Sequence, residues 1–216
     1  MNEKFFELPQ DRQAAILNGA MKRFSAMGYR KASMQDIAAE CGVSKSLLFH
    51  YFGSKEGLFA FLYRYASGRV ADSLKGFRYR DNEDLFEMIR RSNAIKLELF
   101  RTHPYLYKFY YSAYFEQDAA VHELVRGQGA GQVTAEMPVV VEHMDKTVLR
   151  RGLAPEQALQ IILWVSEGFL EQKLQQGTTH PEQLEREFNE WMAVLKHCLY
   201  EEDQTKTAEG VTEDGK

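Results

Sequence analysis

Two short helices on either side of a glycine turn are predicted over residues 33–55, SMQDIAAECGVSKSLLFHYFGSK. Ser33 stands three residues before Asp36. At this spacing the hydroxyl caps a backbone amide at the start of a helix, and the carboxylate reaches back to another. Gly42 supplies the left-handed backbone conformation that ends the first helix, and Ser44 is the N-cap of the second. The chain therefore contains a compact helix, turn and helix near its N-terminus.

The second of these helices has an inward and an outward side. Val43, Leu48 and Tyr51 can point inward, while Lys45, Ser46, Leu47, Phe49 and His50 stay mostly outward. The spacing from Ala38 through Gly42 to Leu48 matches the helix-turn-helix motif, whose second helix enters the major groove of DNA. Lysine can donate to guanine O6 and N7, serine bonds several bases, and leucine packs on a thymine methyl. The first turn of this helix is therefore expected to read bases.

Other side chains around the motif are candidates for phosphate contacts. Tyr51 and Lys55 lie toward the next helix, where a phenol and an ammonium can hold the DNA backbone. The full predicted DNA-binding set is Ser33, Gln35, Lys45, Ser46, Leu47, Phe49, His50, Tyr51 and Lys55. Phosphate contacts position the protein, and base contacts give it sequence specificity.

The charge is uneven along the chain. Residues 1–80 carry thirteen Lys/Arg and seven Asp/Glu, whereas the remainder carries fourteen and twenty-four, for a net charge of −4. A basic N-terminal part is compatible with DNA binding despite the acidic total. The same lysines and arginines are equally typical of a solvated helical surface, so charge alone supports the motif only weakly.

A longer segment carries a family resemblance. Residues 16–62 contain Ile16, Ala20, Phe24 and Gly28-Tyr29, the Ser33 cap, the turn GVSK at 42–45, the block FHYF at 49–52, and Ser54-Lys55. This combination resembles the N-terminal domain of the TetR family of bacterial transcriptional regulators. The family commonly has tyrosine in place of Phe49 and proline or lysine in place of Gly53, so a phosphate contact through that tyrosine hydroxyl is missing here.

The resemblance implies an all-α fold of about nine helices. A three-helix DNA-binding domain with the helix-turn-helix is expected at 1–53, a helical effector-binding and dimerisation domain at 54–200, and a disordered acidic tail at 201–216. The implied function is that of a ligand-responsive repressor that binds a palindromic double-stranded DNA operator as a homodimer. The alternatives are a transcriptional activator, or an architectural DNA-binding protein without a small-molecule effector.

Hydrophobic periodicity places the remaining helices. They are expected at about 10–27 with an end at Gly28, from a Ser54 cap onward, at 83–102, at 133–151 with an end at Gly152, from Pro155 onward, and after Pro181. The run GQGAGQ at 127–132 predicts a loop or kink. The helix that follows Pro155 is apolar on all sides, which indicates deep burial. The helix from Ser54 is expected to transmit the effector signal.

The resemblance also implies an effector cavity in the second domain. Aromatic residues between 105 and 115 could line it, although for each single tyrosine simple core packing is the more common role. The candidate pocket residues are Leu62, Tyr65, Ile89, Phe100, Tyr107, Tyr110, Tyr111, Tyr114, Met144 and Trp164. Glu142, Glu167 and Glu171 leave a cationic ligand as a minority hypothesis.

The last two helices are the expected dimer interface, as the resemblance implies. The candidate residues are Leu159, Ile162, Phe169, Leu184, Phe188, Trp191 and Leu195, and the alternative is that they form intramolecular core. Dimerisation is favoured because two recognition helices must lie about 34 to 36 Å apart to read successive major grooves.

Composition excludes several other classes of protein. The 216 residues are 44% hydrophobic and 27% charged, typical of a globular chain. No apolar run reaches the roughly 20 residues that span a bilayer, and no signal peptide precedes the first helix, so a cytoplasmic location is expected. Cys41 and Cys198 lack CxxC spacing, and His103, His122 and His143 lack HxxxH spacing. No catalytic motif, cofactor or metal site is predicted, so an enzyme is not expected.

Overall fold

The computed structural model describes residues 3–177 and 180–201, and within 126–135 it describes the backbone alone. The described elements are a short 3-10 helix η1 (Glu3–Phe5) and the helices α1 (Gln10–Lys31), α2 (Met34–Cys41), α3 (Lys45–Phe52), α4 (Lys55–Leu74), α5 (Leu85–Thr102), α6 (Pro104–Tyr114), α7 (Ala119–His143), α8 (Pro155–Gln175) and α9 (Pro181–Leu199). The all-α fold class is confirmed. Residues 202–216 of the expected disordered tail lie outside the described residues.

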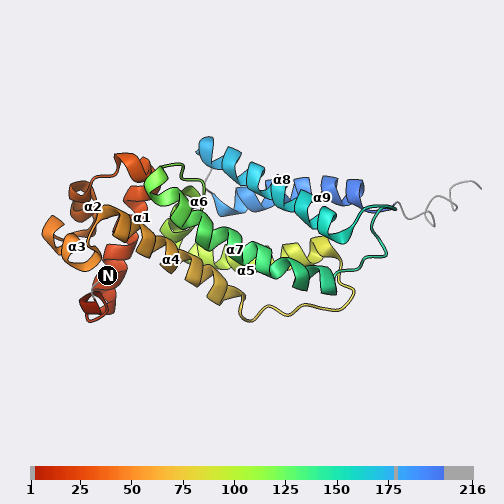
Figure 1. Cartoon of the computed structure of the whole chain (residues 1–216), viewed down its shortest axis with the longest axis horizontal. Coiled ribbons are helices and arrows are strands. Elements are labelled where there is room, and N and C mark those ends of the chain that lie inside the picture. The colour runs from red at the N-terminus through yellow and green to blue at the C-terminus, as the bar shows by residue number, and fades with distance from the viewer. Residues whose placement is uncertain (1–2, 178–179, 202–216) are drawn as a thin grey trace, which may run out of the picture.

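The helices form an elongated molecule with two ends (Figure 1). Helices α1, α2 and α3 gather at one end, and α4 runs from them toward the middle. Helices α8 and α9 lie side by side along the other end, joined by an ion pair between Lys173 and Glu187. None of the described helices is long and apolar enough to cross a membrane.

The first helix of the motif begins and ends at the predicted residues. The Ser33 hydroxyl oxygen accepts a hydrogen bond from the Asp36 amide at 3.1 Å. Gly42 ends α2 with φ of 65° and ψ of 33°, in the left-handed region. The Asp36 carboxylate accepts from the Ser33 hydroxyl at 2.6 Å, where the sequence predicted that it accepts from a backbone amide.

The next two helices also begin at the predicted serines. The Ser44 hydroxyl oxygen accepts from the Leu47 amide at 3.2 Å at the start of α3. The Ser54 hydroxyl oxygen accepts from the Gly57 amide at 2.9 Å at the start of α4. Each cap satisfies one amide that the first helical turn leaves without a partner. Local polar chemistry therefore fixes where the motif helices start.

Helix α1 continues past its predicted end and contains a kink. Gly28 has φ of 71° and ψ of 166°, which is not helical, and a further turn follows it as far as Lys31. The prediction of an end at Gly28 located the irregular residue correctly but missed the last turn. This extra turn places the backbone of Tyr29 and Arg30 beside the start of α4.

Helix α7 differs from the prediction in the glycine-rich run and at its C-terminal end. Its backbone stays helical through 127–132, where a loop or kink was expected. Each glycine in a helix costs about 1 kcal/mol, but apolar residues on both sides of the run are packed, with Val121 and Val125 buried in one core and Val140 packed on another. Tertiary packing thus outweighs the glycine propensity.

The predicted helix at 133–151 stops at His143. The segment after α7 pairs with the segment before α5, because the Glu83 amide donates to the His143 carbonyl at 3.0 Å and the Asp145 amide donates to the Glu83 carbonyl at 2.8 Å. Met144 has an extended backbone, with φ of −71° and ψ of 149°. These backbone hydrogen bonds, of the kind that join neighbouring strands, replace the bonds that would continue the helix.

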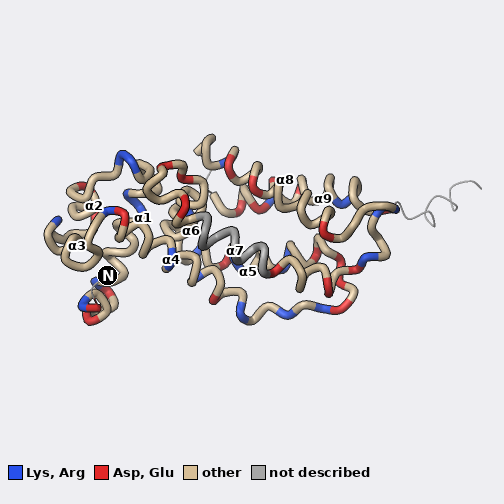
Figure 2. Tube along the Cα trace, in the orientation of Figure 1, with Lys and Arg blue, Asp and Glu red and all other residues tan. Residues whose placement is uncertain are grey.

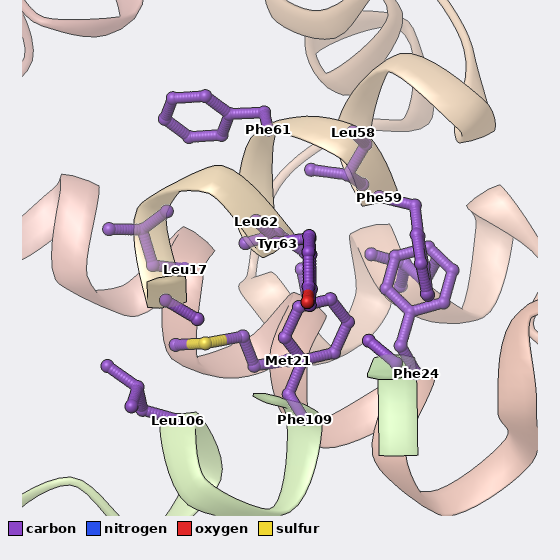
Figure 3. Close-up of a cluster of buried hydrophobic side chains, with 14 of the residues drawn as sticks. Leu17, Met21, Phe24, Leu58, Phe59, Phe61, Leu62, Tyr63, Leu106 and Phe109 are labelled. Carbon is purple, nitrogen blue, oxygen red and sulfur yellow. The ribbon is translucent and has the colours of Figure 1, made fainter. Parts of the chain in front are cut away.

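Two apolar cores hold the fold together. The first joins α1, α2, α3 and α4 to α6 and α7, and Figure 3 shows part of it, with Phe24, Phe59 and Phe109 meeting from α1, α4 and α6. The ring centroids of Phe24 and Phe59 lie 5.0 Å apart, and those of Phe59 and Phe109 lie 5.2 Å apart. The second core joins α5, α8 and α9. Because the first core extends into α6, the end formed by α1, α2 and α3 is packed directly on the helical body.

Candidate functional site

Helix α3 presents a polar outer surface at the tip of the molecule. Lys45, Ser46 and His50 are exposed, and the Phe49 side chain is 40% exposed. Leu47 is half-buried against the first core, and Leu48 is fully buried. The structure therefore brings four of the predicted outward residues to one surface and leaves Leu47 at its edge.

Lys45 and Phe49 interact along the helix. The Lys45 ammonium lies 5.9 Å from the centroid of the Phe49 ring, one helical turn away. A cation above an aromatic face at this distance is attracted to it. Phe49 lacks the hydroxyl of the tyrosine common in related sequences, and in this chain its ring supports the lysine side chain instead.

Tyr51 and Lys55 lie differently from their predicted phosphate-binding positions. Tyr51 is 7% exposed, and its ring packs against Phe5 of η1 with centroids 5.8 Å apart. The Lys55 ammonium donates to the backbone carbonyls of Tyr29 at 3.0 Å and Arg30 at 3.4 Å. Both side chains are thus used within the protein, Tyr51 to pack α3 and Lys55 to tie α4 to the end of α1. The phosphate contacts predicted for these two side chains stay a prediction.

Phe5 packs under α3 and α4 and was missed by the sequence analysis. It is 1% exposed and also contacts Phe52 and Phe61, with ring centroids 5.2 and 5.5 Å away. The only signal in the sequence was an aromatic pair ahead of Pro9. Ser33 and Gln35 are exposed at the start of α2, where they were placed as DNA contacts.

Charge separates the two ends of the molecule (Figure 2). Helices α1, α2 and α3 contain six Lys/Arg and three Asp/Glu. Helices α8 and α9 contain three Lys/Arg and seven Asp/Glu. An end with excess positive charge attracts the DNA backbone, while the acidic end is repelled by it.

A cavity of about 420 Å³ lies in the helical body. Its wall comes from the end of α4 and from α5, α6, α7, α8 and α9, and most of the wall residues are apolar. Four candidate pocket residues lie on this wall, namely Ile89, Phe100, Tyr107 and Tyr111. The volume is within the range of about 300 to 1,000 Å³ that is usual for small-molecule sites.

The other six candidate pocket residues do not line the cavity. Leu62 and Met144 are buried in the two cores, and Tyr65 packs against the first. Tyr110 stacks on Tyr63 with ring centroids 6.0 Å apart, and Tyr114 donates to Glu167 at 2.6 Å. Trp164 is 64% exposed on the outside of α8. Periodicity could not orient these residues because α4, α6 and α8 are apolar on more than one side.

Few polar groups line the cavity. The charged ones are Arg90, Lys96, Glu136 and Glu185. Burial lowers the pKa of Lys96, and the nearby Glu136 carboxylate opposes this shift. Burial raises the pKa of Tyr107 and Tyr111. Lys96 was not among the predicted site residues, although Asn93, Lys96 and Phe100 share one face of α5 at spacings of three and four.

Helix α6 connects the cavity to the DNA-binding end. Tyr107 and Tyr111 lie on the cavity wall, whereas Phe109 is fully buried and tilts against Phe24 of α1 at a centroid distance of 6.2 Å. Opposite sides of one helix therefore contact the cavity and the helix that braces the motif.

The whole fold resembles a known structure. A TetR family transcriptional regulator from Chloroflexus aurantiacus superposes with a TM-score of 0.67 at 16% sequence identity, over 93% of this chain and 99% of that one. At this identity the likeness shows a shared fold.

Sequence comparison is more specific at the DNA-binding end. The family model described as bacterial regulatory proteins, tetR family, matches residues 16–62. The HTH-type transcriptional repressor AcnR of Corynebacterium glutamicum is 28% identical over 148 residues, which cover 62% of this chain and 76% of AcnR. The HTH-type transcriptional regulator RutR of Escherichia coli K12 is 35% identical over 95 residues, which cover 43% of each chain. The chain belongs to the TetR family. It is a DNA-binding transcriptional regulator.

In this TetR family member, the residues predicted for a dimer interface need correction. Leu159, Ile162, Phe169 and Leu184 are between 2% and 7% exposed inside a single chain, and all four line the cavity together with Phe188. Leu195 is half-buried, and Trp191 is 54% exposed. The intramolecular alternative therefore holds for most of the set. The deep burial predicted for α8 is wrong on its outer side, where Trp164 is exposed.

The acidic residues considered for a cationic ligand also lie elsewhere. Glu142, Glu167 and Glu171 are exposed, and none of them lines the cavity. Among the described residues no group of three or more His, Cys, Asp or Glu side chains is placed to hold a metal ion.

Proposed function

We propose that this TetR family protein is a ligand-responsive repressor, which binds a palindromic operator as a homodimer and releases it when a small molecule enters the cavity. One observation carries the proposal: α6 lines the cavity through Tyr107 and Tyr111 and packs on α1 through Phe109. A ligand that displaces α6 acts directly on the helix that braces α2 and α3. The relative AcnR is named a repressor, which supports repression as the outcome.

The DNA-reading role belongs to the exposed side of α3. Lys45 and Ser46 in its first turn are the base-contacting candidates, and His50 lies one turn further along. Ser33 and Gln35 at the start of α2 are candidates for phosphate contacts. Residues 1–53 then form the DNA-binding domain and 54–200 the effector-binding and dimerisation domain, with α4 and α6 packed across the boundary.

The dimer surface is assigned to the outer side of α8 and α9. Trp164, Trp191 and Val194 are each more than half exposed, at 64%, 54% and 53%. Gly168 follows Trp164 by one turn, and a Cβ atom added there meets nothing within 4 Å. A glycine inside a helix costs about 1 kcal/mol relative to alanine. Among the described residues no close contact explains Gly168, whereas the close approach of a partner helix would.

Repression needs only a moderate coupling between ligand and DNA. A coupling free energy of roughly 1 to 3 kcal/mol changes operator affinity about 5- to 150-fold. A change of this size requires only a different spacing of the two recognition helices, and neither domain has to unfold. The architectural alternative has less support, because a protein without an effector has no use for a cavity of about 420 Å³.

The test begins by selecting bound sequences from a random DNA pool. The proposal expects an inverted repeat with half-sites about one helical turn apart, bound by a protein dimer in sedimentation. Compounds that raise the melting temperature are then tested for release of the selected DNA. Enrichment of no sequence over random DNA would support the architectural alternative, and a monomer at micromolar concentration would remove the palindromic operator.

A further inference from the structure

The cavity wall combines a large apolar surface with one half-buried lysine, Lys96. Apolar side chains come from every helix that encloses the cavity, among them Met88, Met137, Ile162 and Phe188, and from Phe77 in the segment after α4. Contact with such a wall favours a ligand with an extended apolar part, because apolar area is removed from water. The charged groups on the wall then decide what else the ligand carries.

Arg90 is already neutralised by a neighbour. Its guanidinium donates to both carboxylate oxygens of Glu87, at 2.7 and 2.6 Å. This bidentate pair lies one turn apart on the surface of α5 and leaves little of the arginine charge for a ligand. Arg90 therefore lines the cavity, but its charge is already paired with Glu87.

Lys96 is in the opposite situation. Among the described residues, no side chain forms an ion pair or hydrogen bond with its ammonium. The nearest acidic influence is Glu136 of α7, which is exposed to water and does not approach within ion-pair distance. A half-buried ammonium without a partner has lost part of its hydration, and a ligand anion in the cavity would offset this cost.

Two further polar side chains lie on the same side of α5. Asn93 and Ser92 precede Lys96 by one turn, and both line the cavity. The Ser92 hydroxyl donates a hydrogen bond to the Ile89 carbonyl at 3.0 Å. The Asn93 amide can donate to the same acceptor as the Lys96 ammonium, which gives a short row of donors in an otherwise apolar wall.

We infer that the cavity takes an amphiphilic monoanion, such as a fatty carboxylate, whose charged oxygens pair with Lys96 and Asn93 while its apolar chain packs on the rest of the wall. This inference rests on the proposed function, since it names the class of effector. A cationic ligand would meet Lys96 with like charge, and a neutral one would leave it unpaired. Glu136 is exposed to water, where its charge is screened, and Glu185 is half-buried.

The experiment measures binding of matched probes to the full chain. Dodecanoate, octanoate, dodecanol and dodecyltrimethylammonium are titrated by calorimetry below their micelle concentrations. We expect dodecanoate to bind more tightly than the alcohol and the ammonium, and octanoate to bind more weakly than dodecanoate. In Lys96→Met, dodecanoate affinity falls by roughly tenfold to a hundredfold, as for loss of a charge-assisted hydrogen bond, whereas dodecanol affinity is retained.

Three controls separate a charge contact from a general defect. Lys96→Arg keeps the positive charge and should retain most of the carboxylate affinity. Lys146→Met removes an exposed lysine that does not line the cavity, so it should bind as the parent does. The ligand-free melting temperature of Lys96→Met should not fall, because the substitution removes an unpaired half-buried charge.

The possible outcomes distinguish the ligand class from the proposed function. Failure of dodecanoate to bind, equal losses of carboxylate and alcohol in Lys96→Met, or tighter binding of the ammonium would each overturn the inference. Release of the selected operator by the ammonium alone would overturn the ligand class while retaining a ligand-responsive repressor. Lys96-dependent binding of dodecanoate with unchanged operator affinity would support the ligand class and count against the proposed function.

Discussion

The Glu116 carboxylate accepts a hydrogen bond from the Tyr29 backbone amide at 2.8 Å, across the boundary between the DNA-binding end and the helical body. The kink at Gly28 frees this amide from the helix, and Glu116 stands in the turn between α6 and α7. The Tyr29 carbonyl meanwhile accepts from Lys55 at the start of α4. At Tyr29 of α1, the start of α4 thus meets the turn that follows α6, and α6 lines the cavity.

Removal of the Glu116 carboxylate should loosen this junction. In Glu116→Ala the Tyr29 amide loses its acceptor, as do the amides of Gln117 and Asp118. An unsatisfied buried amide costs about 1 to 3 kcal/mol. We expect hydrogen exchange at the Tyr29 amide to accelerate and the effect of a bound ligand on operator affinity to shrink. Glu116→Gln keeps a carbonyl acceptor and should restore both, and Glu123→Ala, an exposed change on α7, should alter neither. Unchanged exchange in Glu116→Ala would contradict the junction.

Replacement of Lys55 should destabilise the protein itself. Its ammonium holds two backbone carbonyls and lies 4.4 Å from the centroid of the Tyr29 ring. Hydrogen bonds from a charged group contribute about 1.5 to 3 kcal/mol, so the unfolding free energy of DNA-free Lys55→Ala should fall by that order in urea denaturation. Full stability together with a lower salt slope of DNA binding would show instead that Lys55 contacts phosphate.

Replacement of Lys45 should relax operator discrimination. The exposed ammonium leaves the first turn of α3, where base contacts are made. Lys45→Ala should lose roughly 1 to 3 kcal/mol for the selected operator and much less for random DNA. Fluorescence anisotropy on both DNAs measures this, with Lys75→Ala, an exposed lysine after α4, as the control. Equal weakening on both DNAs would assign Lys45 to phosphate.

A side chain at Gly168 should separate dimer from monomer stability. A Cβ atom added at Gly168 meets no described atom within 4 Å, so the monomer of Gly168→Leu should fold normally, but the added bulk should obstruct a partner helix. Gly68→Leu is a matched control, because Gly68 is an exposed glycine inside α4 with equally open space. Sedimentation equilibrium should show weaker dimerisation for the change at 168 alone. Equal dimerisation of both variants would move the interface away from this side of α8.

The two cysteines should differ in reactivity. Cys41 is buried, its thiol donates to the Ile16 carbonyl at 3.3 Å, and burial raises its pKa from 9.0 to about 12. Cys198 is exposed. Iodoacetamide near neutral pH should therefore modify Cys198 in the native protein, and both thiols after unfolding.

The raised pKa of Cys41 makes the folded protein less stable at alkaline pH. Since the folded state holds the Cys41 proton more tightly, stability is unaffected below the ordinary pKa of 9.0 and falls as pH rises from there toward about 12. Cys41→Ser should flatten this alkaline fall. Native labelling of both thiols at one rate would contradict the burial of Cys41.

Local signals explain what the sequence could predict. Ser33, Ser44 and Ser54 each act on an amide three residues away, so a short stretch of sequence contains the whole interaction. Gly42 likewise sets its own backbone conformation. These four residues were sufficient to position the motif helices and, with their neighbours, to indicate the family.

The cavity and the outer surface depended on information that is not local. Helix α8 is apolar on all sides, so its sequence could not show that Trp164 faces outward while Ile162 faces the cavity. The end of α7 depends on backbone bonds to Glu83, some sixty residues earlier in the chain. Contacts of this kind decide the orientation of side chains only after the helices have packed. For this reason residues predicted for the dimer interface, such as Ile162, line the cavity, and Trp164, predicted for the pocket, lies on the outer surface.

The most direct test of the account is an operator titration with and without a saturating ligand of the cavity. Fluorescence anisotropy of the selected operator should show affinity reduced about 5- to 150-fold when the ligand is bound. The same ligand should leave operator affinity nearly unchanged in Glu116→Ala. If the parent protein binds the ligand by calorimetry and its operator affinity stays the same, the cavity does not control DNA binding through α6.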